Sequence, residues 1–258
     1  MGPLVGRFVE PEITLSESDG LRYLHFGTEW VQGAMSLAHP NALPIEYTRQ
    51  MMGWLLFMQA TQRIVQLGLG AASLTRFCLA KLPQAQITVV EPSERVVQAA
   101  RQWFHLPPES ERFQLAKEDG AVFLSAARAG AASILQVDVY DAMAQGPVLD
   151  SINFYRSCRG ALGAPGILAV NLFGSHASFA VNRQRIHEVF DGAILEMPQG
   201  EAGNIVVLAF KGGPFLATWA MLEKRARLLA QEFDLEAPQW VKHFRGSQGA
   251  RARGLQVG

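Results

Sequence analysis

The sequence predicts an α/β fold in which a doubly wound, mostly parallel sheet of seven strands follows a small antiparallel β appendage. Two observations predict it. From residue 63 onward, short runs rich in β-branched and aliphatic residues alternate with longer runs of helical periodicity, which is typical of a parallel sheet covered on both faces. Before residue 38, the runs are short and strand-like throughout, and turn-forming residues separate them.

The appendage is expected to span residues 1–44. Its strand-like runs lie at 12–15, 21–26 and 29–37, and the segment PNALP closes it. Apolar residues then recur at helical spacing over 45–62, which predicts one connecting helix with a wide buried face. A larger α/β domain is expected over residues 45–258.

Within that domain the strands and helices are expected to alternate. The predicted strands are 63–67, 86–90, 112–116, 133–138, 166–172, 193–197 and 204–210. The predicted helices are 72–82, 93–103, 121–129, 150–162, 176–190 and 216–232. Ligand sites in such folds lie beyond the carboxyl ends of the strands, so the residues that follow each strand are the candidates for function.

Composition argues against nucleic-acid and membrane partners. The 23 Lys and Arg balance the 23 Asp and Glu, so the net charge of +0 creates no field that attracts a polyanion. Four cations near the C-terminus are interpreted as part of a solvated tail: Lys242, Arg245, Arg251 and Arg253. No stretch approaches the ~18 consecutive apolar residues of a membrane span, and no signal peptide is evident. We expect a cytoplasmic protein.

Cysteine and histidine usage predicts neither a metal site nor a nucleophile. Cys78 and Cys158 lie among apolar residues in helix-like runs, so packing explains them better than a disulfide or a zinc site. The 6 histidines are scattered without ligand spacing, so no metal is expected.

The first two strand ends indicate a nucleoside site. Gly68 and Gly70 follow the first strand of the α/β domain and allow a ligand to approach the main chain, although a tight strand-to-helix turn would use the same glycines. Glu91 ends the second strand, about twenty residues further on, where a carboxylate can bind both hydroxyls of a ribose. This spacing favours nucleoside binding over simple helix capping.

The next two strand ends also carry acids. Asp119 and Gly120 follow the third strand, where the carboxylate can accept a hydrogen bond from the amine of a base or can cap a helix. Asp138 and Asp141 follow the fourth strand, where they can attract a cationic amine and accept its proton, or can order the loop as an Asx turn.

Taken in order, these motifs resemble the spermidine synthase (polyamine aminopropyltransferase) family, built on the Rossmann-like fold of class I S-adenosylmethionine-dependent methyltransferases. The resemblance covers residues 31–210 and rests on these segments: VQGAM at 31–35, Tyr47, GLG at 68–70, VVEPSERVV at 89–97, DGAVFL at 119–124, DVYD at 138–141 and Phe154-Tyr155.

The resemblance implies a role for each candidate residue. Gln32 and Glu91 would hold the ribose of the nucleoside. Asp119 and Gly120 would hold the adenine. Asp138 would be the base, with Asp141 and Tyr47 lining the channel for a small-molecule amine. The implied co-substrate is decarboxylated S-adenosylmethionine, or S-adenosylmethionine itself, and a homodimer is expected.

Several departures from the family pattern leave alternatives open, among them Val139 and Tyr140 in place of part of the family's DSSDP segment. Ala71 stands where the family's GGGDGG turn has an acid that faces the charged tail of the donor. Thr48 and Arg49 stand where the family usually has polar or acidic residues that grip the amine. The missing acid would suit S-adenosylmethionine and methyl transfer, since it removes a repulsion toward the donor's carboxylate. The substituted amine side would also suit a non-catalytic relative that only binds a nucleoside.

Overall fold

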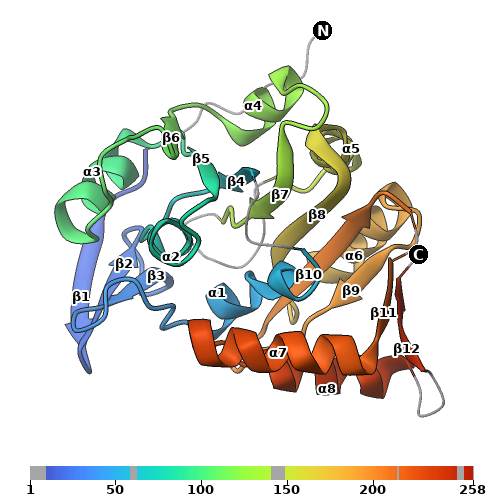
Figure 1. Ribbon diagram of the computed structural model, residues 1–258. Helices are drawn as coiled ribbons and strands as arrows, with labels where there is room; N and C mark the ends of the chain where they lie inside the picture. The colour runs from blue at the N-terminus through green and yellow to red at the C-terminus, as the bar shows by residue number, and fades with distance from the viewer. Residues whose placement is uncertain (1–9, 59–62, 141–148, 214, 249–252, 258) are drawn as a thin grey trace, which may run out of the picture.

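A seven-stranded sheet runs through the centre of the structure, a computed structural model that describes residues 10–58, 63–140, 149–213, 215–248 and 253–257 (Figure 1). Its strands, in spatial order, are β6 (Phe113–Ala116), β5 (Gln86–Val90), β4 (Arg63–Leu67), β7 (Ala132–Val137), β8 (Leu162–Phe173), β10 (Asn204–Lys211) and β9 (Ile194–Glu196). The first five are parallel, whereas β10 runs antiparallel to both β8 and β9. The predicted fold class is confirmed.

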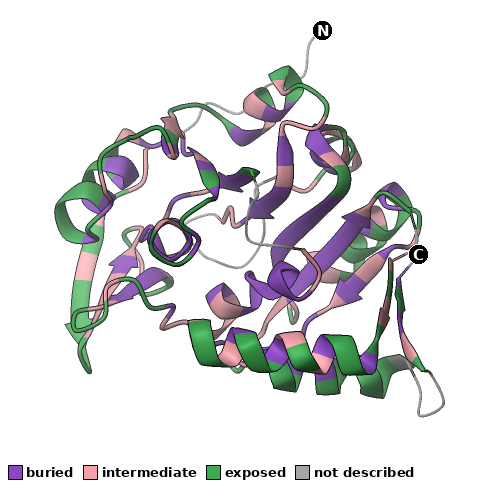
Figure 2. Cartoon of the chain, in the orientation of Figure 1, coloured by how far each residue is buried: buried purple, intermediate pink, exposed green. Residues whose placement is uncertain are grey.

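Helices cover both faces of this sheet, because successive strand residues point to opposite sides and both sides are apolar. Ile64 belongs to one hydrophobic cluster and its neighbour Val65 to the other. The helices of the first face are α1 (Glu46–Gln50), α2 (Ser73–Lys81), α3 (Glu94–Trp103), α7 (Trp219–Phe233) and α8 (Ala237–Gln248). Those of the second face are α4 (Gly120–Ala126), α5 (Ile152–Ala161) and α6 (Ser178–Val189). Buried residues accordingly concentrate in the sheet and on the inner helix faces (Figure 2).

The N-terminal appendage is a three-stranded antiparallel sheet of β1 (Thr14–Ser18), β2 (Leu21–His25) and β3 (Val31–Ser36). It packs beside α2: the Ser73 hydroxyl donates a hydrogen bond to the Ala34 carbonyl at 2.7 Å. Ala71 and Phe104 share a small core with the appendage. The division of the chain at residue 44 stays a prediction.

Two predicted elements of the N-terminal part were wrong in detail. The first strand continues through Ser18, because the turn falls at Asp19-Gly20, whose positive φ angles of 52° and 75° close the hairpin. The connecting helix of 45–62 is instead a short α1 followed by a 3-10 turn at Gly53–Leu56, and residues 59–62 lie outside the described part. Every residue from 51 to 56 is buried, which one face of a straight helix cannot achieve.

The C-terminal tail is not a solvated end but a packed part of the fold. Helix α8 buries Trp240, Val241 and Phe244 against the first face of the sheet, beside α7 (Figure 1). After it, β12 (Gly254–Val257) pairs antiparallel with β11 (Phe215–Thr218), so the last predicted helix begins later than expected, as α7. Apolar residues thus outweigh the basic ones in deciding how this segment folds.

Candidate active site

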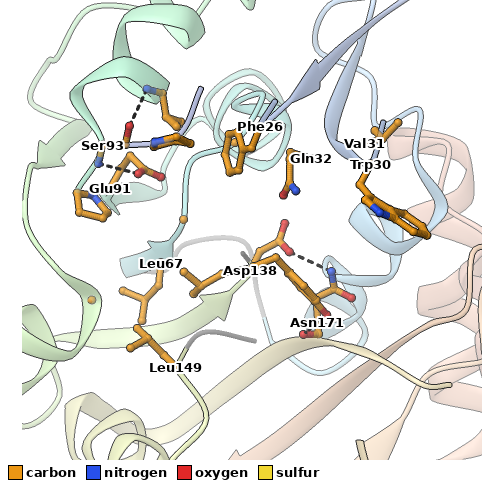
Figure 3. A pocket seen from close by; sticks show the side chains of 18 of the residues that line it. Phe26, Trp30, Val31, Gln32, Leu67, Glu91, Ser93, Asp138, Leu149 and Asn171 are labelled. Carbon is orange, nitrogen blue, oxygen red and sulfur yellow. Dashed lines mark hydrogen bonds between the residues drawn. The ribbon is translucent and has the colours of Figure 1, made fainter. Parts of the chain in front are cut away.

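A cavity of about 910 Å³ lies at the carboxyl ends of the parallel strands, and residues of β3 and α1 also line it. Leu67 and Val90 end two of these strands at its floor, and Asn171 lies near the end of β8. The eight predicted site residues within the described part of the chain all line it: Gln32, Tyr47, Gly68, Gly70, Glu91, Asp119, Gly120 and Asp138. The structure therefore brings together side chains from segments far apart in the sequence (Figure 3). Asp141 lies outside the described residues.

The turn after β4 needs glycine at its first position for a steric as well as a conformational reason. Gly68 has φ of +89°, and a Cβ atom placed on it would lie 2.2 Å from the carbonyl oxygen of Asp138. Gly70, with φ of +49°, approaches the Gln32 carbonyl closely enough that a Cβ atom would lie 3.2 Å away. The turn is thus tightly packed between the Asp138 backbone and β3.

Glu91 holds this turn from the side. Its Oε2 accepts from the Leu69 N–H at 3.0 Å, and its Oε1 accepts from the Ser93 N–H at 2.9 Å. Burial raises the pKa of Glu91, the Glu10 carboxylate adds to this, and the hydrogen bonds from Ser93 and Leu69 oppose the rise. Because each carboxylate oxygen can accept two hydrogen bonds, both oxygens retain capacity for hydroxyl donors from a ligand.

Glu10 is a lining residue that sequence reasoning missed. Its carboxylate accepts from the Ser93 hydroxyl and from the N–H of Glu94 at 3.0 Å, so it sits at the N-terminus of α3. Burial raises the pKa of Glu10, but the hydrogen bonds from Ser93, Glu94 and Arg95 outweigh it, and the net pKa lies below the ordinary value. No local signal could have found this contact, since Glu10 and Ser93 are 83 positions apart.

Asp119 caps helix α4 while it lines the cavity. Its Oδ1 accepts from the backbone N–H groups of Ala121 and Val122, at 2.8 and 3.2 Å. Its Oδ2 makes no hydrogen bond within the described part of the chain. One oxygen therefore serves the helix, as the capping interpretation predicted, and the other is available to a ligand.

Asp138 is the centre of a hydrogen-bonded cluster. Its Oδ2 accepts from the Tyr47 hydroxyl at 3.2 Å, and its Oδ1 accepts from the Asn171 amide at 3.0 Å. Figure 3 shows this carboxylate facing the amide of Gln32 across the cavity. Burial raises the pKa of Asp138 above its ordinary value, and the hydrogen bonds from Asn171 and Tyr47 oppose the rise only in part.

The partners of Asp138 have fixed roles as donors. Burial and the negative charge of Asp138 raise the pKa of Tyr47 well above its ordinary value, so its hydroxyl stays protonated. Asn171 is held in turn, because its Oδ1 accepts from the Asn204 amide at 3.0 Å and its carbonyl accepts from the Tyr140 hydroxyl at 2.9 Å. Sequence reasoning missed Asn171, near the carboxyl end of the apolar strand β8, and Asn204, the first residue of β10. A polar side chain near the carboxyl end of a strand is the signal that could have found Asn171. Asn204 begins β10, and it reaches this edge of the sheet because β10 runs antiparallel to β8.

Two residues that depart from the family pattern, Arg49 and Ala71, lie outside the cavity lining, whereas Val139 and Tyr140, which replace part of the family's DSSDP segment, line it. The Arg49 guanidinium donates to Glu236 at 2.6 Å and to the carbonyls of Leu43 and Pro44, so it adds no positive charge to the site. Ala71 is 2% exposed and packs on Gly33, where an added Cβ would lie 2.7 Å from the Ala71 Cβ. The charge of this cavity is therefore set by other residues.

The described lining of the cavity is rich in acids and contains no basic residue. Six carboxylates line it: Glu10, Glu12, Glu29, Glu91, Asp119 and Asp138. No lysine, arginine or histidine is among the lining residues in the part of the chain that the structure describes. Such a site attracts cations and disfavours anionic ligands.

The described residues hold no group of three or more His, Cys, Asp or Glu with the geometry of a metal site. Cys78 and Cys158 are both buried and free, and burial raises the pKa of the Cys78 thiol to about 12. Among the described helices, none is long and apolar enough to span a membrane.

The fold and the placement of the cavity define a Rossmann-like protein of the class I methyltransferase type, whose site lies at the carboxyl ends of the parallel strands. Curated relatives narrow the class. The chain is 34% identical over 247 residues to the polyamine aminopropyltransferase of Chromobacterium violaceum, covering 96% of this chain and 94% of the relative. It is 37% identical over 238 residues to that of Neisseria meningitidis serogroup B, covering 92% and 90%. The chain belongs to the polyamine aminopropyltransferase family.

Solved structures agree with this fold. A probable spermidine synthase from Corynebacterium glutamicum superposes with a TM-score of 0.70 at 22% identity, covering 95% of this chain and 94% of its own. Human methyltransferase-like protein 13, in complex with SAH, gives 0.64 at 20% identity over 73% of this chain and 92% of its own. A spermidine synthase in complex with the transition-state analogue AdoDATO gives 0.59 at 18% identity, over 78% and 74%. No protein-family model matches the chain.

Proposed function

We propose that this protein transfers an aminopropyl group from decarboxylated S-adenosylmethionine to a small-molecule amine. The observation that carries the proposal is the charge of the cavity, whose described lining includes six carboxylates and no basic residue. Both substrates of this reaction are cationic, since the donor carries a sulfonium and an ammonium and the acceptor carries at least one ammonium. An acidic, partly buried cavity stabilises them through favourable charge interactions.

The same charge favours the decarboxylated donor over S-adenosylmethionine. The carboxylate of the intact donor would find no cationic partner among the described lining residues. Six lining acids would repel it, so the substitution at Ala71 does not by itself make the cavity suited to a carboxylate. Family membership supports aminopropyl transfer independently of the charge, since the curated relatives are polyamine aminopropyltransferases.

In the proposed arrangement the nucleoside occupies the end of the cavity near β5. Glu91 and Gln32 bind the ribose hydroxyls, and the glycine turn provides the close approach. The free oxygen of Asp119 accepts from the exocyclic amine of adenine, and Gly120 leaves room for the ring. Burial raises the pKa of Glu91, so its ability to accept from both hydroxyls depends on pH.

The acceptor amine lies at Asp138 in this arrangement. Its nitrogen attacks the propyl carbon bonded to sulfur. A C–N bond forms, the C–S bond breaks, and the bonding electron pair goes to sulfur, which leaves as a neutral thioether. The nitrogen loses one proton, and Asp138 is placed to accept it. Its raised pKa makes it a stronger base than an ordinary aspartate. Asp141 stays a predicted contact of the amine.

Calorimetric titration and a transfer assay test the proposal together. Decarboxylated S-adenosylmethionine is expected to bind more tightly than S-adenosylmethionine, and methylthioadenosine is expected to bind as the product. Asp138→Asn should lower the turnover of a diamine or polyamine acceptor by about a hundredfold or more while methylthioadenosine still binds. A preference for S-adenosylmethionine would instead support methyl transfer. Binding without turnover of any amine by the unmodified protein would support a non-catalytic relative. A homodimer and a cytoplasmic location remain predictions from the sequence.

A further inference from the structure

A row of polar side chains lies buried in the sheet next to the proposed active site. Gln66 on β4 and Gln136 on β7 are register partners, and their side chains are 1% and 0% exposed. Gln136 precedes Asp138 by two residues, so both side chains point to the same face of the sheet. Buried amides in an otherwise apolar core are costly unless every donor and acceptor is paired.

Each polar atom of this row has a defined partner. The Thr75 hydroxyl of α2 donates to Gln66 Oε1 at 2.7 Å, and Gln66 Nε2 donates to Gln136 Oε1 at 2.8 Å. Gln136 Nε2 then donates to the main-chain carbonyl of Met51 at 2.9 Å. The direction of donation is the same along the row, so each amide has a single orientation that satisfies its neighbours.

The row ends at the turn that carries Tyr47. Met51 is the C-cap residue of helix α1, and its N–H donates to the Tyr47 carbonyl at 2.8 Å. The Tyr47 side chain extends from the same turn to Asp138, 3.2 Å from hydroxyl to carboxylate. The helix is only five residues long, so its own hydrogen bonds hold it weakly.

We propose that Gln136 is a positioning residue: by holding the Met51 carbonyl, it fixes the α1 turn that presents the Tyr47 hydroxyl to Asp138. Gln66 and Thr75 orient Gln136 and connect this turn to α2, the helix that follows the glycine turn. The inference rests on the proposed function, in which Asp138 accepts the proton of the amine. It adds a residue that touches neither substrate but sets the geometry of two that do.

The inference makes the basicity of Asp138 depend on Gln136. In the described part of the chain, the titratable groups that interact with Asp138 are Tyr47 from α1 and Tyr140 from the segment after β7. The hydrogen bond from Tyr47 lowers the pKa of Asp138. A loosened α1 turn weakens that bond, so the pKa of Asp138 should rise and the base should be lost at a higher pH.

Gln136→Met tests this, since methionine keeps the length and removes the amide. The acid limb of the pH profile should move to higher pH in this variant. At a fixed pH on that limb, kcat/KM should therefore be about three- to tenfold lower than in the unmodified protein. Thr75→Val, at the far end of the row, should shift the limb in the same direction by less and is the milder variant should Gln136→Met fold poorly. In a Tyr47→Phe background, Gln136→Met should move the limb no further, because the interaction through which it acts is already gone.

Asn182→Leu is the matched control. Asn182 is also a fully buried amide, but it bonds the Tyr155 hydroxyl and the Ser178 carbonyl on the other face of the sheet. The Asn182→Leu variant should have a lower melting temperature, and the acid limb of its pH profile should not move. Unchanged limbs in both Gln136→Met and Thr75→Val, or a further shift in the Tyr47→Phe background, would overturn the inference.

A carboxyl ¹³C titration of Asp138 in the ligand-free protein separates this inference from the proposed function. The resonance is assigned by its loss in Asp138→Asn, and its midpoint should rise in Gln136→Met and stay in place in Asn182→Leu. If the unmodified protein aminopropylates no amine, the proposed function fails while the titration still decides the role of Gln136. If transfer occurs and the midpoint does not move in Gln136→Met, only the positioning role fails.

Discussion

The hydroxyl of Tyr47 donates a hydrogen bond to Oδ2 of Asp138 over 3.2 Å, although the two residues are 91 positions apart in the chain. One comes from the short helix α1 and the other from the end of strand β7. Burial raises the pKa of both groups, so the tyrosine remains a donor and the aspartate becomes a stronger base. Substitutions at Tyr47 and Asp138 therefore test the proposed chemistry directly.

Tyr47→Phe should shift the acid limb of kcat/KM to higher pH. In the proposed mechanism, activity requires ionised Asp138 and is lost as the pH falls through its pKa. Removing a donor to the carboxylate raises that pKa, so the loss begins at a higher pH. At neutral pH we expect kcat/KM to fall about tenfold, as for the loss of one hydrogen bond to a charged group. Tyr155→Phe is the control, since that buried hydroxyl bonds Asn182 on the other face of the sheet, and its profile should match the unmodified protein. Superimposable profiles for Tyr47→Phe would contradict the prediction.

Glu91 should make nucleoside binding depend on pH. Because burial raises its pKa, protonation should remove an acceptor and weaken methylthioadenosine binding at a higher pH than for an exposed glutamate. In Glu91→Gln we expect affinity about tenfold weaker and nearly independent of pH in that range, since the amide cannot accept on both sides. Calorimetric titration from acid to neutral pH measures both effects. An unaltered affinity in Glu91→Gln would place the ribose elsewhere.

Gly68→Ala should lose both stability and activity. The new Cβ would meet the Asp138 carbonyl at 2.2 Å, in a backbone conformation with φ of +89°. Gly20→Ala is the matched control, because its φ is +75° but no atom lies within 4 Å of the added Cβ. Gly20→Ala should cost about 1 kcal/mol from conformation alone, and Gly68→Ala clearly more. Thermal or chemical unfolding compares the two, and equal losses would show that the contact with Asp138 is not tight.

Phe244→Ala should strongly destabilise the protein even though the residue is near the C-terminus. Its ring is buried on α8 and packs near Phe57, with centroids 6.4 Å apart. Truncating a buried phenylalanine costs about 3–5 kcal/mol. Lys242→Ala, an exposed position on the same helix, should change the free energy of unfolding by at most about 0.5 kcal/mol. Similar unfolding midpoints for the two variants would restore the picture of a solvated tail.

The acids of the site were predictable because of where strands end. Parallel strands bring their carboxyl ends to one edge, so Glu91, Asp119 and Asp138 could be placed around one cavity from spacing alone. The contacts that modify them were not predictable. Glu10 reaches Ser93 from a segment with no local pattern. Asn171 lies near the carboxyl end of an apolar strand, which marks it as a candidate but does not show that it donates to Asp138.

The C-terminal segment and the connecting helix show the same limit in the fold. The cations of residues 242–253 suggested a solvated tail, but Trp240 and Phe244 find a partner surface that exists only once α7 and the 3-10 turn are in place. Residues 51–56 have helical periodicity, yet the core around Gly53, close against Met197, bends them into a tighter turn. In both places burial against distant residues outweighs local preference.

The sequence by itself determined the α/β class, the alternation of strands and helices and the acids at successive strand ends, because these depend on periodicity and on short-range spacing. Only the tertiary structure decided which groups those acids meet. It turned Arg49 toward Glu236, buried Ala71 against Gly33, and set Tyr47 against Asp138. Hydrogen bonds and charge interactions act over a few ångströms in space whatever the separation along the chain, so the basicity of Asp138 is a property of the folded protein alone.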